Sequence, residues 1–215
     1  MVTIKFFTNG GFGENTYILS DESKSCIIID PGCYQKVEEE EIKNYISENN
    51  LKVEKIVNTH CHIDHVLGNY TMKKAYNAPI YIPENEVEVL KAVPLFAPMW
   101  GFPAYQEQEP DFLIKREQKT IEFGNTTLEI LYVPGHSPGH LAYYHKEEKF
   151  CINGDVLFRM SVGRTDLPGG NHSQLMDSIR NVMYQLPDDV TVYCGHGDET
   201  TIGFEKKHNP FCRVN

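Results

Sequence analysis

Short apolar segments rich in β-branched residues alternate with turn signals along the first third of the chain. Four such segments predict strands, at residues 2–7, 15–19, 25–30 and 55–58. Between the last two lies a segment, 34–50, whose apolar positions recur with helical spacing. It predicts a surface helix with Val37, Ile42, Tyr45 and Ile46 on its inner face. The ranges 64–76 and 84–92 predict two further helices.

The second half of the chain begins with two predicted hairpins, at residues 120–133, around a Gly-Asn turn, and at 140–153. A strongly amphipathic helix follows at 171–186, with a capping box formed by Asn171 and Gln174 at its start. The segment 190–194 predicts the last strand.

The order is therefore strands, helices, strands, helix and strand, in two similar halves. This order predicts an α/β protein in which sheets pack together with helices outside them. A chain of 215 residues fits one domain, so we expect a single domain over 1–215.

The segment 94–110 lacks periodicity and contains four prolines and the only Trp of the chain. A loop that is so long and so apolar is uncommon unless it covers something. Two interpretations stay open: a loop that caps the core, or one wall of a substrate pocket.

Composition narrows the class of protein. Hydrophobic residues make up 40% of the chain and charged residues 23%, which is ordinary globular composition. The net charge of -10 argues against a nucleic-acid surface, because phosphate binding requires a dense basic face. The N-terminal segment lacks the features of a signal peptide, and no stretch is apolar enough for a membrane span. The six cysteines are scattered without a CxxC pair, which predicts free thiols and a cytoplasmic protein.

The segment from Thr59 to His65, THCHIDH, carries the strongest chemical signal. Three imidazoles and a carboxylate lie within six consecutive residues, and both groups are good ligands for zinc and similar divalent ions. In extended backbone, His60 and His62 direct their rings to the same side. Asp64 and His65 begin the following helix and present a second set of ligands, so one short loop could hold two ions.

Three further predicted strands end in a ligand-type residue beside a glycine. These residues are His136, Asp155 and His196, in the segments ILYVPGH, FCINGD and VYCGH. Ligands at the carboxyl ends of strands gather at one edge of a sheet. Together with the THCHIDH loop, they predict a metal centre.

The pattern HxHxDH, followed by a distant His, Asp and His, resembles the metallo-β-lactamase superfamily over nearly the whole chain. The resemblance implies a four-layer αβ/βα sandwich, with two mixed sheets packed face to face and helices outside. It implies two divalent metal ions, zinc foremost, with iron or manganese also compatible. One ion would bind His60, His62 and His136; the other would bind Asp64, His65 and His196. Asp155 would bridge them.

The bridging Asp155 and the Asp64–His65 pair resemble glyoxalase II, the hydroxyacylglutathione hydrolases, whereas lactamases of the superfamily place Cys or Ser at the bridging position. The segments GRTDLPGGNHSQL and TTIGFEKKHNPF are similar to small members of this branch. The resemblance implies hydrolysis of S-lactoylglutathione or a related small thioester by a hydroxide between the metals. Asp155 would hold the metal spacing, and Asp64 would also hydrogen-bond the hydroxide.

Full-length glyoxalase II carries a helical C-terminal domain with cationic residues for glutathione, and we expect this chain to lack it. Low-priority candidates for substrate contacts are Tyr143, Lys206, Lys207 and Arg213. The oligomeric state, monomer or dimer, stays open.

Other roles in this region also stay open. Asp30 is either an orienting group behind a ligand or a turn residue. His140 is interpreted as structural, and Arg164 as a partner of Asp166 or an anchor for loops. Cys61 is interpreted as a small buried residue.

Two other activities of the same fold compete with thioester hydrolysis. A persulfide dioxygenase keeps one iron, for which His60, His136 and Asp155 would form a two-histidine, one-carboxylate site. A phosphodiesterase or nuclease is disfavoured by the net charge. A metal-buffering module without activity would need neither a bridging carboxylate nor a covering loop.

Overall fold

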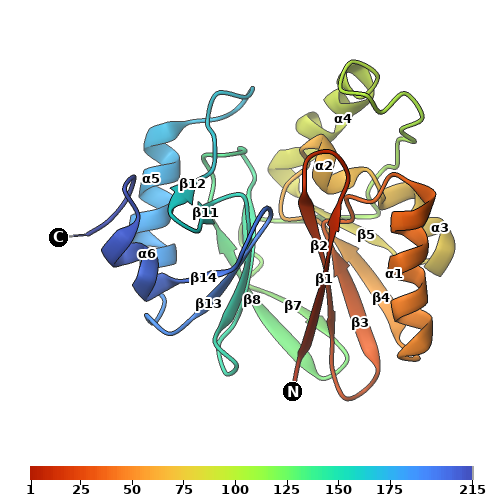
Figure 1. Ribbon diagram of the computed structural model, residues 1–215, viewed down its shortest axis with the longest axis horizontal. Helices are drawn as coiled ribbons and strands as arrows, with labels where there is room; N and C mark the ends of the chain where they lie inside the picture. The colour runs from red at the N-terminus through yellow and green to blue at the C-terminus, as the bar shows by residue number, and fades with distance from the viewer. Residues whose placement is uncertain (215) are drawn as a thin grey trace. The chain divides into compact units, whose positions relative to one another are not determined.

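The structure, a computed structural model, describes residues 1–214. The chain divides into two compact units. Unit 1 comprises Met1–Lys115 and Glu122–Thr126, and unit 2 comprises Arg116–Ile121 and the chain from Thr127 onward. Each unit is built around a six-stranded sheet and is described here by itself (Figure 1). The expectation of a single domain stays a prediction.

The sheet of unit 1 has the order β1-β2-β3-β4-β5-β6. Its strands are β1 (Thr3–Asn9), β2 (Glu14–Ser20), β3 (Ser25–Ile29), β4 (Lys52–Val57), β5 (Ile80–Pro83) and β6 (Phe112–Ile114). The first three strands pair antiparallel, and β3 to β6 pair parallel. The carboxyl ends of β3, β4 and β5 therefore meet at one edge of the sheet, and the segments that leave this edge carry the chemistry.

The helices of unit 1 pack their apolar faces on this sheet. They are α1 (Lys36–Glu48), α2 (Ile63–Val66), α3 (Asn69–Tyr76), η1 (Glu84–Glu86) and α4 (Val87–Phe96). In the core, Ile42 and Ile46 of α1 and Met72 of α3 join strand residues such as Ile28 and Ile56. Figure 1 shows α1 and α3 along one face of the sheet.

Three expectations for unit 1 need correction. Val37 is 56% exposed rather than on the inner face of α1, because at about 100° per residue it lies on nearly the opposite side of the helix from Ile42 and Ile46. The helix expected at 64–76 is split by a turn at residues 67–68. The fourth helix runs on to Phe96 with Pro94 inside it, so the aperiodic segment begins later than expected.

The rest of that segment lies over α2. Ala97 and Phe102 pack with Leu67, and the ring of Phe12 from the β1–β2 turn stacks on Phe102 at 5.5 Å between centroids. Within unit 1 the segment thus caps a small apolar cluster, as one of the two interpretations expected. Met99, at 80% exposure, points away from it.

The second sheet has the order β14-β13-β10-β9-β8-β7. Its strands are β7 (Thr120–Phe123), β8 (Thr126–Tyr132), β9 (Leu141–His145), β10 (Phe150–Gly154), β13 (Thr191–Cys194) and β14 (Thr200–Thr201). β9 pairs antiparallel with β8 and β10, and β10 pairs parallel with β13. The strands β8, β10 and β13 therefore run in one direction and end at the same edge. The short β11 (Leu157–Phe158) and β12 (Ser161–Val162) form a separate hairpin.

Two helices and one 3-10 turn cover this sheet: α5 (His172–Asn181), η2 (Met183–Gln185) and α6 (Ile202–His208). Leu175 and Ile179 of α5 and Ile202 of α6 share a core with Val192 and Cys151. One half of the expected capping box is present, because the side chain of Asn171 accepts a hydrogen bond from the Gln174 amide at 3.0 Å. The Asn171 amide donates to the Gly135 carbonyl at 2.7 Å instead of to the Gln174 side chain. The helix expected to reach residue 186 ends at Asn181 and tightens into η2.

Two further expectations concern the chain as a whole. All six cysteines are free and buried, as expected. Among residues 1–214, no helix is both long and apolar enough to cross a membrane.

Candidate metal centre

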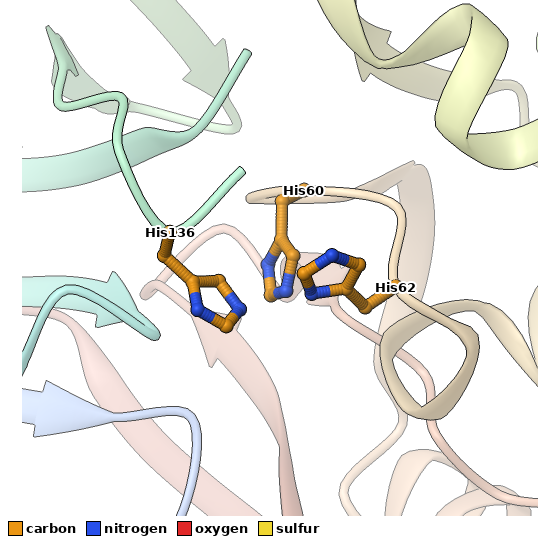
Figure 2. A group of neighbouring side chains, drawn as sticks. All are labelled: His60, His62 and His136. Atoms are coloured by element: carbon orange, nitrogen blue, oxygen red, sulfur yellow. The ribbon is translucent and has the colours of Figure 1, made fainter. Parts of the chain in front are cut away.

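The predicted ligand loop leaves the carboxyl end of β4 in extended backbone and enters α2 at His62. The rings of His60 and His62 lie with centroids 4.7 Å apart and nearly perpendicular, at 86° (Figure 2). Asp64 and His65 follow in the single turn of α2. The Nε2 atom of His65 lies 3.8 Å from Asp64 Oδ2. The loop thus brings together the four ligand-type side chains expected of it.

Asp30 supports this loop from the end of β3. Its Oδ1 accepts a hydrogen bond from the Thr59 amide at 2.7 Å, and its Oδ2 accepts one from the Thr59 hydroxyl at 2.6 Å. Oδ2 also lies 3.1 Å from Nδ1 of His65. A carboxylate on Nδ1 fixes the ring and directs Nε2 the opposite way, as groups behind metal ligands do.

Asp30 is also a turn residue, since its φ of 50° is left-handed. The turn conformation and a contact with the predicted ligand His65 are therefore both present, and the orienting role toward a metal ligand stays a prediction. Asp30, His60 and His65 could themselves form a cation site, because their ligand atoms lie within 4.8 Å of one another. The hydrogen bonds that Asp30 accepts from Thr59 and the contact with His65 favour the orienting role instead.

In unit 2, three predicted ligands follow three strands that end at the same edge. His136 follows β8, Asp155 follows β10 directly, and His196 follows β13. His136 is the third side chain drawn in Figure 2. The Nε2 atoms of His136 and His196 lie 3.5 Å and 3.4 Å from the same oxygen, Asp155 Oδ2.

These distances fit shared coordination better than hydrogen bonding. A good N–H···O bond spans about 2.7–3.2 Å. Two ligands that each lie about 2.1 Å from a tetrahedral metal are about 3.4 Å apart. Each imidazole of unit 2 therefore lies at a distance from the Asp155 carboxylate that suits two ligands of one divalent ion.

Further contacts in unit 2 hold these groups. The Arg164 carbonyl lies 2.8 Å from Nδ1 of His136, which directs Nε2 toward Asp155. His140 Nε2 accepts the backbone N–H of Asp155 at 3.0 Å, which confirms a structural role for His140. The Arg164 side chain pairs with Asp166 at 2.7 Å, as expected.

Cys61 lies inside the ligand loop but is fully buried. Burial raises the pKa of its thiol well above the usual range, and the charges of Glu86 and Asp30 raise it further. A neutral thiol is a poor nucleophile and a poor metal ligand. The interpretation of Cys61 as a buried structural residue is therefore supported.

The substrate candidates occupy varied positions. Tyr143 is fully buried in β9, and Lys206 forms an ion pair with Asp188 at 2.7 Å. Lys207 and Arg213 are exposed. Their contacts with substrate stay predictions.

Two buried carboxyl groups near the loop were not anticipated. Glu86, after β5, accepts the Cys61 amide at 3.0 Å. Glu14, at the start of β2, is fully buried; burial raises its pKa well above the usual range, although His65 acts in the opposite direction. Neither residue belongs to a local motif: Glu14 directly precedes the strand predicted at 15–19, and Glu86 lies within the helix predicted at 84–92.

The chain matches the profile of the metallo-beta-lactamase superfamily over residues 9–196. It is 35% identical to the hydroxyacylglutathione hydrolase GloC of Haemophilus influenzae over 201 residues, which covers 93% of each chain.

Solved structures agree with this match. BLEG-1, a B3 metallo-beta-lactamase, superposes with a TM-score of 0.89 at 34% identity, over 97% of this chain and 99% of the other. TTHA1623 in a di-iron-bound form superposes with a TM-score of 0.85 at 33% identity, over 96% of this chain and 99% of the other. ETHE1 from Myxococcus xanthus superposes with a TM-score of 0.78 at 25% identity, over 97% of this chain and 83% of the other. The fold expected from the ligand pattern is thus confirmed as the metallo-β-lactamase fold, and the chain belongs to the metallo-β-lactamase superfamily.

Proposed function

We propose that the two groups of ligands act together as one site for two divalent ions. One ion is held by His60, His62 and His136, the second by Asp64, His65 and His196, and Asp155 bridges them. The observation that carries this proposal is the contact of two imidazoles with one Asp155 oxygen, at 3.4 and 3.5 Å. The di-iron form of TTHA1623, 33% identical to this chain, supports two ions over one. Zinc suits the imidazole-rich set, and iron and manganese accept the same ligands.

We further propose that the reaction is hydrolysis of a small thioester, as in hydroxyacylglutathione hydrolases. The 35% identity to GloC over 93% of both chains supports this activity. The carboxylate at position 155, in place of the Cys or Ser of lactamases, argues against a lactamase activity. The net charge of -10 disfavours nucleic acid as substrate.

Two bound divalent ions would supply a hydroxide at neutral pH and polarise the substrate carbonyl. The chain itself provides the ligands and their orientation. Asp155 sets the spacing of the two halves of the site, and Asp64 can accept a hydrogen bond from the attacking water. A thiol with a pKa near about 8.5 leaves readily, so no separate acid is needed on the protein. This accounts for a site without a Ser or Cys nucleophile.

A persulfide dioxygenase with one iron is the second candidate. The set His60, His136 and Asp155 would serve one iron as two histidines and a carboxylate. The similarity to ETHE1, at 25% identity, keeps this candidate open. The difference between the candidates lies in metal content and in the use of oxygen.

The proposal is tested by assaying purified protein, with its metal content measured, on three substrates. We expect hydrolysis of S-lactoylglutathione, followed as loss of the thioester, with activity lost on chelation and restored by Zn²⁺. The second substrate is a chromogenic cephalosporin. The third is glutathione persulfide, for which oxygen uptake is measured with an electrode. Oxygen uptake without thioester hydrolysis selects the dioxygenase, and cephalosporin hydrolysis alone selects a lactamase; either result overturns the proposal.

A further inference from the structure

The backbone of the ligand loop is held by two side chains from neighbouring segments. Residues 58–62 belong to neither a helix nor a strand, so their amide groups need other partners. The Thr59 amide donates to Asp30 Oδ1 at 2.7 Å, and the Cys61 amide donates to Glu86 Oε2 at 3.0 Å. These two residues alternate with His60 and His62.

The topology of the sheet explains how both carboxylates reach the loop. The loop follows β4, Asp30 follows β3, and Glu86 ends η1, which directly follows β5. Since β3, β4 and β5 are parallel neighbours, the loop lies between two segments that each bring one carboxylate to it. Successive side chains of an extended segment point to opposite sides. Tethering the loop at 59 and 61 therefore fixes the direction of the rings at 60 and 62.

Glu86 is fully buried, and so is Cys61. Taking a carboxyl group out of water is unfavourable unless hydrogen bonds compensate for it. An apolar side chain would fill this position in the core at lower cost. The hydrogen bond to the ligand loop gives a reason for an acceptor here.

We propose that Glu86 is a positioning residue for the metal centre. By accepting the Cys61 amide, it fixes the backbone between His60 and His62 and so sets the separation and mutual angle of their rings. The expected consequence of this contact is tighter metal binding, and that part of the inference rests on the proposed function. The contact itself belongs to unit 1 alone and can be tested without metal.

The test compares Glu86→Leu, which removes the acceptor, with Glu86→Gln, which keeps an acceptor oxygen at the same reach. Glu88→Leu, at an exposed position paired with Lys91, is the matched control. Two quantities are measured: the Zn²⁺ dissociation constant by competition with a chelator, and hydrogen exchange of the Cys61 amide in chelator-treated protein.

We expect Glu86→Leu to weaken Zn²⁺ binding about 10- to 100-fold, the usual effect of removing a group behind a ligand. We also expect faster exchange at Cys61 in this variant. Glu86→Gln and Glu88→Leu should stay close to the wild type in both measurements. A merely structural role would lower stability without this rescue by glutamine.

Unchanged Zn²⁺ affinity in Glu86→Leu, or an equal loss in Glu86→Gln, overturns the inference. If Glu86→Leu does not fold, Zn²⁺ binding is measured in Glu86→Asp instead, which keeps the charge on a side chain one methylene shorter. Wild-type Zn²⁺ affinity in Glu86→Asp also overturns the inference. If the wild type binds no Zn²⁺, the proposed metal centre fails, whereas exchange at Cys61 still reports whether Glu86 holds the loop.

Discussion

The carboxylate of Asp30 and the imidazole of His65 are in contact in the interior of unit 1, with Oδ2 3.1 Å from Nδ1 and both side chains buried. The two residues are far apart in sequence and meet because β3 and β4 are parallel neighbours. The contact selects the tautomer of His65 and directs its Nε2 away from Asp30. Asp30 therefore connects the fold of the sheet to the direction of a proposed metal ligand.

Replacing Asp30 with Ala should affect both stability and metal binding. The Thr59 amide and hydroxyl and Nδ1 of His65 would lose the carboxylate that they contact, at a cost of about 1–3 kcal/mol for each buried group left unsatisfied. We expect a lower midpoint of urea unfolding and Zn²⁺ binding about 10- to 100-fold weaker. Asp177→Ala, at an exposed helix position, is the control. Equal Zn²⁺ affinity in the two variants would show that Asp30 does not orient His65.

Gly135 precedes the predicted ligand His136 and has a φ of 133°, which side chains rarely adopt. A Cβ at this position would lie 2.2 Å from the backbone nitrogen of Leu175 in α5. We expect Gly135→Ala to destabilise the protein by about 3 kcal/mol or more, measured by denaturant unfolding, since backbone strain and overpacking add.

Gly197→Ala is the matched control, because Gly197 also adjoins a predicted ligand and also has a positive φ, of 70°. A Cβ there meets nothing within 4 Å, so only the backbone cost of about 1–2 kcal/mol remains. Similar losses of stability in the two variants would show that the close approach of Leu175 is not what excludes a side chain at position 135.

Asp21 makes stability depend on pH. Burial alone would raise the pKa of its carboxyl, but hydrogen bonds from Ser23, Asn125 and Thr126 outweigh burial and hold the pKa below its usual range. The carboxylate therefore stabilises the folded state above the unfolded pKa, and this contribution is lost as the pH falls through the lower folded pKa.

The predicted consequence is a pH-dependent effect of Asp21→Asn. At pH 7 the variant should be less stable by about 1.5–3 kcal/mol, the value of a hydrogen bond to a charged group. The gap should narrow below about pH 4. Urea unfolding of both proteins at several pH values measures it, and the contribution of the metal ligands cancels in the difference. A stability difference between the two proteins that grows as the pH falls would contradict the lowered pKa of Asp21.

The sequence predicts most strands and helices of both units because their apolar positions follow a local period. Ile42 and Ile46 mark the buried stripe of α1 as expected, and Leu175 and Ile179 mark that of α5. By contrast, α6 is missed, since it is short and Gly203 in its first turn lowers its helix propensity.

The candidate site likewise contains residues that a local sequence pattern reveals and residues that it does not. The predicted ligands His60, His62, Asp64 and His65 can be found because they are close in sequence. The remaining predicted ligands can be found because each follows a strand. Glu86 could not be found, because its contact with Cys61 depends on β5 lying beside β4, and a local pattern does not encode the order of strands.

Asp155→Ala tests the proposed bridge. Without this carboxylate the two ions lose a shared ligand, so we expect the metal content to fall from two ions per chain to at most one, and thioester hydrolysis to be lost. Asp166→Ala removes an exposed carboxylate that pairs with Arg164 and should retain both ions. Full metal content together with retained activity in Asp155→Ala would remove the bridging role.

The most direct measurement is a crystal structure of the metal-replete protein with anomalous scattering from the bound ions. The account predicts two peaks per chain, each about 2.0–2.2 Å from its imidazole and carboxylate ligands, with an Asp155 oxygen next to both. A single peak, or ligand side chains that point apart under metal-replete conditions, would contradict it.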